Sequence, residues 1–199
     1  TSSMADNEAT EKVDDNQEQS QEKTVPAQRA ALTPLQKLTA SANSGNARAQ
    51  HDLGLKYLQG YGVARDPKQG AQWLEQSANV GMPKAQYHIG LLYQKGLGVS
   101  SDMKTAFGWY QKAARQGHVR AQYNLGTLYA EGKGTERDYA EAARWFSRAS
   151  REGLAEAHYS LGMIHENGLG VEPNQRKAAA HYRSALAAGS THAAAKLTW

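Results

Sequence analysis

The chain has 199 residues, 40% of them apolar, with no cysteine and a formal net charge of +4. This length suits one domain with appendages, and the apolar content suffices for a packed core. The lack of cysteine excludes disulfides, thiolate zinc sites and a cysteine nucleophile. No stretch reaches the roughly 18 consecutive apolar residues of a membrane-spanning helix, so we expect no membrane span.

The first 31 residues are acidic and poor in large apolar side chains. Residues 1–24 hold seven acidic and two basic side chains, a net charge of −5, which leaves +9 for residues 25–199. Too little apolar surface is available here to offset a backbone ordering cost of about 1–2 kcal/mol per residue. We predict a disordered acidic tether over residues 1–31, with a tail that folds on a partner as the alternative. The start at Thr1 suits a removed signal peptide, a missing anchor or an excised piece equally.

From residue 33 onward, the same amino acids recur every 36 residues. Ala85 and Gly90, for example, recur as Ala121 and Gly126. A fixed period of this length is typical of stacked helix pairs, so we predict an all-α fold, an α/α solenoid, over residues 32–199. The predicted units are a half-repeat cap at 33–46, full repeats at 47–82, 83–118, 119–154 and 155–190, and a partial C-terminal helix at 191–199.

The first helix of each repeat is predicted from apolar residues on one face. In the second repeat, Ala85, Ile89 and Tyr93 are spaced by four residues, which places them on one side of a helix. Gly90, in the middle, costs about 0.5–1 kcal/mol relative to alanine, so we expect it to permit close helix approach. Gly96 is typical of a left-handed residue that ends a helix. A phosphate-binding interpretation of these glycines needs a preceding strand, whereas a helix precedes each copy.

The second helix of each repeat begins at a side chain that caps helices well. The predicted caps are Asp66, Asp102, Asp138 and Asn174, and the cap of the half repeat is Thr33. Since a cap is needed in every copy and a catalytic carboxylate only once, we predict caps and not acid or base groups. Seven residues later stand Trp73, Trp109, Trp145 and His181, which we predict to be core residues between repeats. A platform for stacking nucleic-acid bases is the alternative.

This pattern resembles the Sel-one-like repeat family, whose members are relatives of tetratricopeptide repeats. In the second repeat the resemblance is carried by Ala85, Ile89, Gly90, Tyr93, Gly96, Gly98, Val99, Asp102, Ala106, Trp109, Ala113, Ala114 and Gly117. The resemblance implies a right-handed superhelix with a concave face lined by the first helices, and an adaptor or scaffold role. The fourth repeat departs from the pattern, because His165 and His181 replace the usual tyrosine and tryptophan.

If the apolar positions of the first helices face the core, the remaining positions of these helices form a stripe that faces outward. These positions vary between copies, which favours a partner-binding groove, with a merely solvated face as the alternative. Arg48, Lys84 and Arg120 form a basic ladder that favours an acidic partner. Leu55, Leu91 and Met163 are the predicted apolar anchors. The predicted partner-binding residues are Arg48, Asp52, Leu55, Lys84, His88, Leu91, Lys95, Arg120, Asn124, Thr127, Glu131, Glu156, Ser160 and Met163.

The function that follows is that of a non-enzymatic scaffold or adaptor for a partner protein, regulatory in a bacterial envelope or secretion context. We expect a monomer in the periplasm or secreted, with the cytoplasm as the alternative compartment. An immunity-type protein that masks a toxin or enzyme is the alternative function. A nucleic-acid-binding solenoid is disfavoured, because no base-reading pair recurs in each repeat.

No catalytic residue, cofactor or metal ligand is predicted. The histidines are scattered over different repeat positions and lack the His-Glu-x-x-His spacing of a zinc site on a helix. His158 and His165 lie two helical turns apart, a spacing from which both side chains can reach one metal ion. His165 occupies a core tyrosine position, however, which argues against such a site.

Overall fold

The computed structural model describes residues 30–198, and this part of the chain contains helices and no strand. The predicted all-α solenoid is therefore confirmed. Residues 1–29 of the predicted tether and Trp199 lie outside the described residues. The helices are α1 (Pro34–Asn43), α2 (Ala47–Gln59), α3 (Pro67–Asn79), α4 (Pro83–Lys95), α5 (Met103–Arg115), α6 (Val119–Glu131), α7 (Tyr139–Arg151), α8 (Ala155–Asn167), α9 (Gln175–Ala187) and α10 (Thr191–Ala195).

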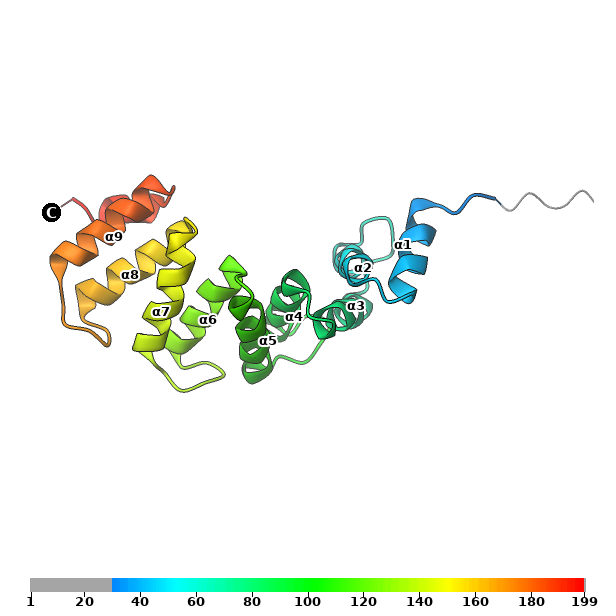
Figure 1. The fold of residues 1–199 in the computed structure, drawn as a ribbon, viewed down its shortest axis with the longest axis horizontal. Helices are drawn as coiled ribbons and strands as arrows, with labels where there is room; N and C mark the ends of the chain where they lie inside the picture. Colours follow the sequence, from blue (N-terminus) through cyan, green and yellow to red (C-terminus); the bar gives the residue numbers. More distant parts are fainter. Residues whose placement is uncertain (1–29, 199) are drawn as a thin grey trace, which may run out of the picture. The chain divides into compact units, whose positions relative to one another are not determined.

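Within Leu32–Trp199 the helices pack in chain order, each against the next (Figure 1). The pairs α2 with α3, α4 with α5, α6 with α7 and α8 with α9 form four repeats along a curved row, and α1 packs on α2 before them. The last helix, α10, is shorter than the predicted segment 191–199. It ends because the backbone N–H groups of Lys196 and Leu197 donate to carbonyls three residues earlier, a tighter turn than the α-helix.

The helix ends follow the sequence signals. Asp66, Asp102, Asp138 and Asn174 each accept a hydrogen bond from the backbone N–H three residues later. Thr33 and Gln36 form a reciprocal capping box at the start of α1. At the other ends, the left-handed residues are Gly60, Gly96, Gly132 and Gly168, with φ between 65° and 70°. The predicted caps and stops are confirmed.

Two glycines allow close approach of backbone and side chains in the second, third and fourth repeats. A Cβ atom on Gly126 would lie 2.8 Å from the Phe146 ring, so the predicted role of the mid-helix glycine is confirmed. The second glycine of the following loop has a role that the sequence pattern did not predict. A Cβ atom on Gly98 would lie 2.1 Å from the carbonyl oxygen of Pro67, in the preceding repeat. These loops therefore pack directly on the neighbouring second helix.

The core runs from one repeat into the next. Trp109 is 9% exposed and packs in a cluster with Ala71 and Leu74 of the preceding repeat, as predicted. Beside it on α5, Tyr110 is fully buried, and its hydroxyl donates to Gln94 Oε1 at 2.6 Å. In the fourth repeat His181 is only half-buried, so this position contributes less apolar area there.

A buried glutamine joins consecutive repeats at three junctions. The Nε2 groups of Gln50, Gln86 and Gln122 donate to backbone carbonyls eight residues earlier, at 3.2, 3.3 and 3.2 Å. Each accepting carbonyl belongs to the last turn of the preceding helix and also accepts from the backbone N–H of the glycine three residues later. The fourth copy carries His158, whose buried Nδ1 has no hydrogen-bond partner among residues 30–198. The fourth junction therefore lacks the contact that closes the others.

Replacing His158 with glutamine is expected to raise the free energy of unfolding by about 1 kcal/mol, because it adds a buried hydrogen bond of the kind made by Gln122. Urea denaturation followed by helical circular dichroism measures the change. The reverse replacement, Gln122→His, is the matched control and should destabilise the chain by a similar amount. A stability change of the same sign in both variants would contradict this account of the junction.

Candidate binding surface

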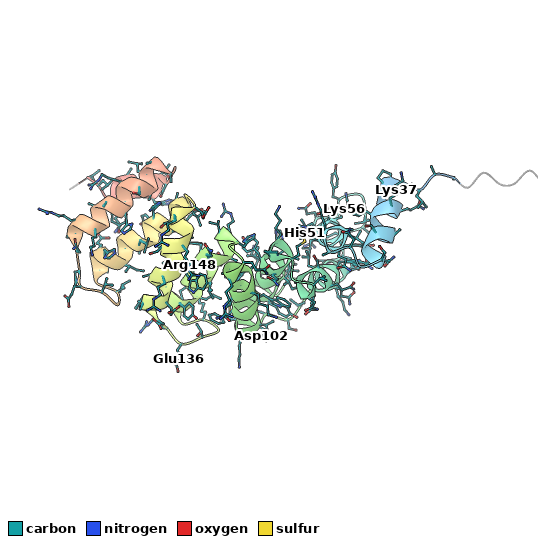
Figure 2. The ribbon with its side chains drawn as sticks, viewed as in Figure 1. Lys37, His51, Lys56, Asp102, Glu136 and Arg148 are labelled. Atoms are coloured by element: carbon teal, nitrogen blue, oxygen red, sulfur yellow. The ribbon has the colours of Figure 1, made fainter. Side chains whose placement is uncertain are left out.

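Every residue of the predicted stripe lies on the first helices α2, α4, α6 and α8. We call the solvent-facing surface formed by these residues the first-helix face. His51 of α2 lies on the inner side of the curved row in Figure 2, whereas Asp102 and Glu136, in the loops before second helices, lie on its outer side. The first-helix face thus faces away from the loops that connect the two helices of each repeat.

The three predicted apolar anchors differ in exposure. Leu55 and Leu91 are half-buried and pack against the core clusters, because they lie beside the neighbouring repeat. Met163 is 38% exposed. Of the three, Met163 therefore offers the most apolar surface to a partner, and the two leucines serve mainly the packing of the repeats.

The basic members of the stripe are exposed. Arg48, Lys84 and Arg120 each stand in the first turn of their helix. Arg120 Nη1 lies 3.9 Å from Glu156 Oε1, and both side chains are more than half exposed, at 60% and 51%. A pair this long and this exposed contributes little, so the Arg120 guanidinium stays available to a partner.

Two aromatic rings stack where α4 meets the start of α6. The Tyr87 ring stacks on the His118 ring, with centroids 4.6 Å apart. Burial lowers the pKa of His118, and the charges of Lys84 and Arg120 lower it further. His118 is therefore uncharged at neutral pH, and positive charge at this spot comes from the lysine and the arginine.

A histidine pair joins the first two repeats on this surface. His51, which is buried, places Nε2 at 2.9 Å from His88 Nδ1 and Nδ1 at 3.1 Å from Asp52 Oδ1. The stripe prediction included His88 and Asp52 but missed His51. The signal was present, because residues 51 and 88 are one repeat and one residue apart, which makes them diagonal neighbours on adjacent first helices.

Acidification is expected to destabilise this junction. Burial, and then the charges of the neighbouring His51 and His118, lower the pKa of His88 to about 4 from an ordinary 6.5. A lowered histidine pKa means that the unfolded chain binds the proton more tightly. The stabilising contribution is therefore complete above pH 6.5 and is lost as the pH falls toward 4, by about 3 kcal/mol. Among residues 30–198, the acidic group within hydrogen-bond reach of the pair is Asp52, which is exposed and contacts His51.

The measurement is urea denaturation at several pH values between 7 and 4. His88→Gln should flatten the pH dependence, because glutamine keeps hydrogen-bonding groups but does not titrate. The matched control is His192→Gln, since His192 is exposed on α10. An equal pH dependence in wild type and His88→Gln would contradict the assignment.

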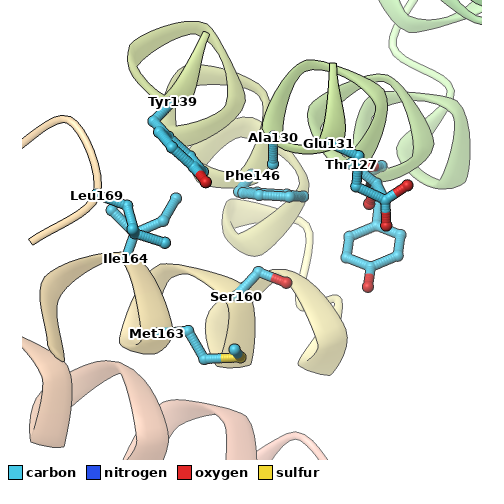
Figure 3. A pocket seen from close by; sticks show the side chains of 10 residues that line it. Thr127, Ala130, Glu131, Tyr139, Phe146, Ser160, Met163, Ile164 and Leu169 are labelled. Carbon is cyan, nitrogen blue, oxygen red and sulfur yellow. Dashed lines mark hydrogen bonds between the residues drawn. The ribbon is translucent and has the colours of Figure 1, made fainter. Parts of the chain in front are cut away.

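A pocket opens on the first-helix face between the third and fourth repeats (Figure 3). Its volume is about 250 Å³, and its walls come from α6, α7, α8 and the loop that follows α8. Four predicted stripe residues, Thr127, Glu131, Ser160 and Met163, line it. The sequence interpretation missed the other lining residues, which are Tyr123, Ala130, Tyr139, Phe146, Ile164 and Leu169.

The fourth repeat holds its histidines apart from this pocket. The rings of His165 and His181 stack with centroids 5.4 Å apart and an angle of 3° between planes, and His158 lies 6.3 Å from His181. Among residues 30–198, no three or more histidine, aspartate or glutamate side chains are placed to hold one metal ion.

None of the described helices has the length and apolar character needed to cross a membrane.

Comparison with known proteins settles the family. A family model described as Sel1 repeat matches residues 47–82, 83–118, 119–154 and 155–190, which is more than half of the chain. The chain belongs to the Sel1 repeat family. The resemblance inferred from the sequence is therefore confirmed, and Sel1 repeat proteins are scaffolds for protein interaction. A comparison with curated protein sequences finds no match.

Solved structures include close relatives of this Sel1 repeat protein. It is 35% identical to a protective antigen of uropathogenic Escherichia coli strains with an SLR fold, with a TM-score of 0.79 over 80% of this chain and 34% of that chain. It is 31% identical to a Sel1 repeat protein of Oxalobacter formigenes, with a TM-score of 0.73 over 82% of this chain and 73% of that chain. The chain thus spans about a third of the length of the E. coli antigen.

A third similar structure is the immunity protein Pa5087 of Pseudomonas aeruginosa. It is 27% identical to this chain, with a TM-score of 0.50 over 84% of this chain and 64% of that chain. The lower TM-score indicates that its overall arrangement is less similar to that of this chain.

Proposed function

We propose that this Sel1 repeat chain is a non-enzymatic adaptor that docks a segment of a partner protein on its first-helix face. The observation that carries the proposal is an open, largely apolar pocket on this face, on the same helix row as the exposed Lys84 and Arg120. A pocket supplies affinity through a buried side chain, and exposed charge steers the encounter. The proposed partner is acidic, and the proposed setting is a regulatory role of the monomer in a bacterial envelope.

The variation between repeats supports this surface over the others. Positions that pack the repeats keep the same residue, as in Gly54, Gly90, Gly126 and Gly162. The exposed positions of the first helices change from copy to copy, so packing does not dictate them. A standard interface buries about 1,600 Å² in total, an area within reach of four adjacent helices.

The double charge reversal Lys84→Glu and Arg120→Glu tests the proposal. Full-length tagged chain is incubated with bacterial envelope extract, and the recovered partner is quantified by mass spectrometry. We expect recovery to fall about tenfold or more, which corresponds to at least about 1.4 kcal/mol of binding free energy. Both side chains are exposed and lie near helix N-termini, where glutamate is well tolerated, so helical circular dichroism should stay unchanged.

The matched control is Lys68→Glu with Lys104→Glu. These lysines occupy the second position of α3 and α5, which corresponds to the position of Lys84 and Arg120 in α4 and α6. The control makes the same change in charge on the second helices, and recovery should stay within about twofold of wild type. Equal losses in both double variants would show a general charge effect and contradict a site on the first-helix face.

An immunity-type function is a second candidate, favoured by the similarity to the immunity protein of P. aeruginosa. In this case the partner is a toxin or enzyme that the chain masks. Addition of one equivalent of the chain to the purified partner should then abolish the partner's activity, and the Lys84→Glu, Arg120→Glu variant should restore it. Binding without any loss of partner activity would favour the adaptor over the immunity function.

A further inference from the structure

We propose that the first-helix face recognises one kind of segment, in which a bulky apolar side chain lies about three to five residues from acidic residues. The apolar side chain enters the pocket between α6 and α8, and Lys84 and Arg120 receive the acidic groups. This inference rests on the proposed function and names the chemistry of its partner.

The pocket exists because one repeat carries smaller residues at two positions. The equivalent positions of the four repeats hold Leu58, Gln94, Ala130 and Glu166. Gln94 fills its space and accepts a hydrogen bond from Tyr110 at 2.6 Å. In the next repeat alanine stands in place of this glutamine, and Thr127 replaces Leu91. The loss of these side chains leaves the volume of about 250 Å³ between the third and fourth repeats.

The chemistry of the pocket fits an apolar group. Phe146, Ile164 and Leu169 form its apolar lining, as the close view in Figure 3 shows. Two of its polar side chains already have partners, since the Thr127 hydroxyl donates to the Tyr123 carbonyl at 3.1 Å and the Glu131 carboxylate lies 2.9 Å from Lys133 Nζ. No buried side-chain atom of a lining residue lacks a hydrogen-bond partner. The lining side chains therefore do not need a polar ligand to complete their hydrogen bonds.

The size of the pocket fits one large side chain. An apolar cavity of about 150 Å³ already accepts a benzene ring, and drug-sized ligands occupy about 300–1,000 Å³. At about 250 Å³, this pocket lies between the two. A tryptophan, phenylalanine, leucine or methionine side chain of a partner matches that volume.

The charged residues of the first-helix face determine at which end of the partner segment the acidic residues lie. Arg120 and Thr127 lie seven residues apart on α6, a distance of about 10 Å at 1.5 Å per residue, and Ala130 lies about 15 Å from Arg120. An extended chain covers this distance in about three to five residues. Lys84 extends the positively charged region over the second repeat. On the other side, in the fourth repeat, the negative charge of Glu156 repels an acidic group of the segment. The acidic residues therefore lie toward the second repeat.

The test selects peptides from a phage-displayed library of random 12-residue sequences on the full-length chain. A segment of 12 residues reaches about 40 Å when extended, which is enough to span both subsites. Selected peptides are synthesised and their affinities are measured by fluorescence anisotropy. Two variants are compared with wild type: Ala130→Leu, which fills the pocket, and Ala180→Leu, which makes the same change at an exposed position of α9.

Ala130→Leu should fold, because Leu58 occupies the equivalent position in the first repeat. We expect the enriched peptides to share a bulky apolar residue three to five positions from acidic residues. Their affinity should fall about tenfold or more in Ala130→Leu and stay within about twofold in Ala180→Leu. Lys84→Glu with Arg120→Glu should also weaken them by about tenfold.

Three outcomes would overturn the inference or its basis. Peptides that lose affinity on charge reversal but bind Ala130→Leu as well as wild type would leave the proposed function standing and refute the pocket. Enrichment of basic peptides, or of peptides without a bulky apolar residue, would refute the partner chemistry. Failure to enrich any peptide that senses the first-helix face would contradict the proposed function itself.

Discussion

Replacement of Gly98 with alanine is expected to lower the free energy of unfolding by about 3 kcal/mol. Two costs add in this variant. The backbone at Gly98 has φ of +73°, a left-handed conformation that costs an alanine about 1 kcal/mol or more. The new Cβ atom would also lie 2.1 Å from the carbonyl oxygen of Pro67, so the backbone of one repeat must shift, at a cost of about 1–3 kcal/mol.

Gly62 provides the matched control for this prediction. It holds the same position in the first repeat with φ of +75°, but a Cβ atom there would have nothing within 4 Å. Gly62→Ala should therefore cost only the conformational term, about 1 kcal/mol. Urea denaturation of both variants measures the difference. Equal losses for Gly62→Ala and Gly98→Ala would contradict the direct contact between neighbouring repeats.

Replacement of Tyr110 with alanine is expected to cost about 4 kcal/mol, because it empties a fully buried aromatic position in the middle of the solenoid. Tyr110→Phe should cost only about 1 kcal/mol, since it removes the hydroxyl that donates to Gln94 at 2.6 Å and keeps the ring. The equivalent residue of the next repeat is Phe146, so the fold accepts phenylalanine there. A large loss in Tyr110→Phe would show that the hydrogen bond, and not packing, dominates this site.

Stability in a solenoid is close to a sum over repeats and their interfaces. Gly98→Ala acts at one interface, so it should also separate the unfolding of the first repeat from that of the others. Tyr110→Ala acts inside the second repeat and should destabilise both of its interfaces. Circular dichroism reports the helix content of the whole chain, whereas tryptophan fluorescence reports the surroundings of residues such as Trp73, Trp109 and Trp145. Unfolding transitions that differ between the two measurements would show that the repeats unfold separately.

Features set by nearby residues could be predicted from the sequence. The cap at Asp102 depends on a hydrogen bond to the backbone of Thr105, and the stop at Gly96 depends on its own φ angle. Packing positions such as Trp109 could also be predicted, because the 36-residue period identifies them in several copies at once. These interactions are either local in the sequence or repeated in several copies, and both kinds can be recognised in the amino-acid sequence.

Features set by the space between repeats could not be predicted. The pocket depends on how far the smaller Ala130 side chain leaves α7 and α8 exposed, a volume that no single helix determines. The contact of Gly98 with Pro67 joins the loop of one repeat to the helix of another. Each requires the geometry of a junction, which the period alone does not give.

The most direct test of a partner on the first-helix face is photo-crosslinking in living cells. A photoreactive amino acid replaces Lys95 or Glu156, which are exposed on α4 and α8, or Lys104 or Arg176, which are exposed on α5 and α9. The account predicts that the same partner protein is captured from Lys95 and Glu156 and not from Lys104 or Arg176. Capture of that partner from the second helices alone would contradict it.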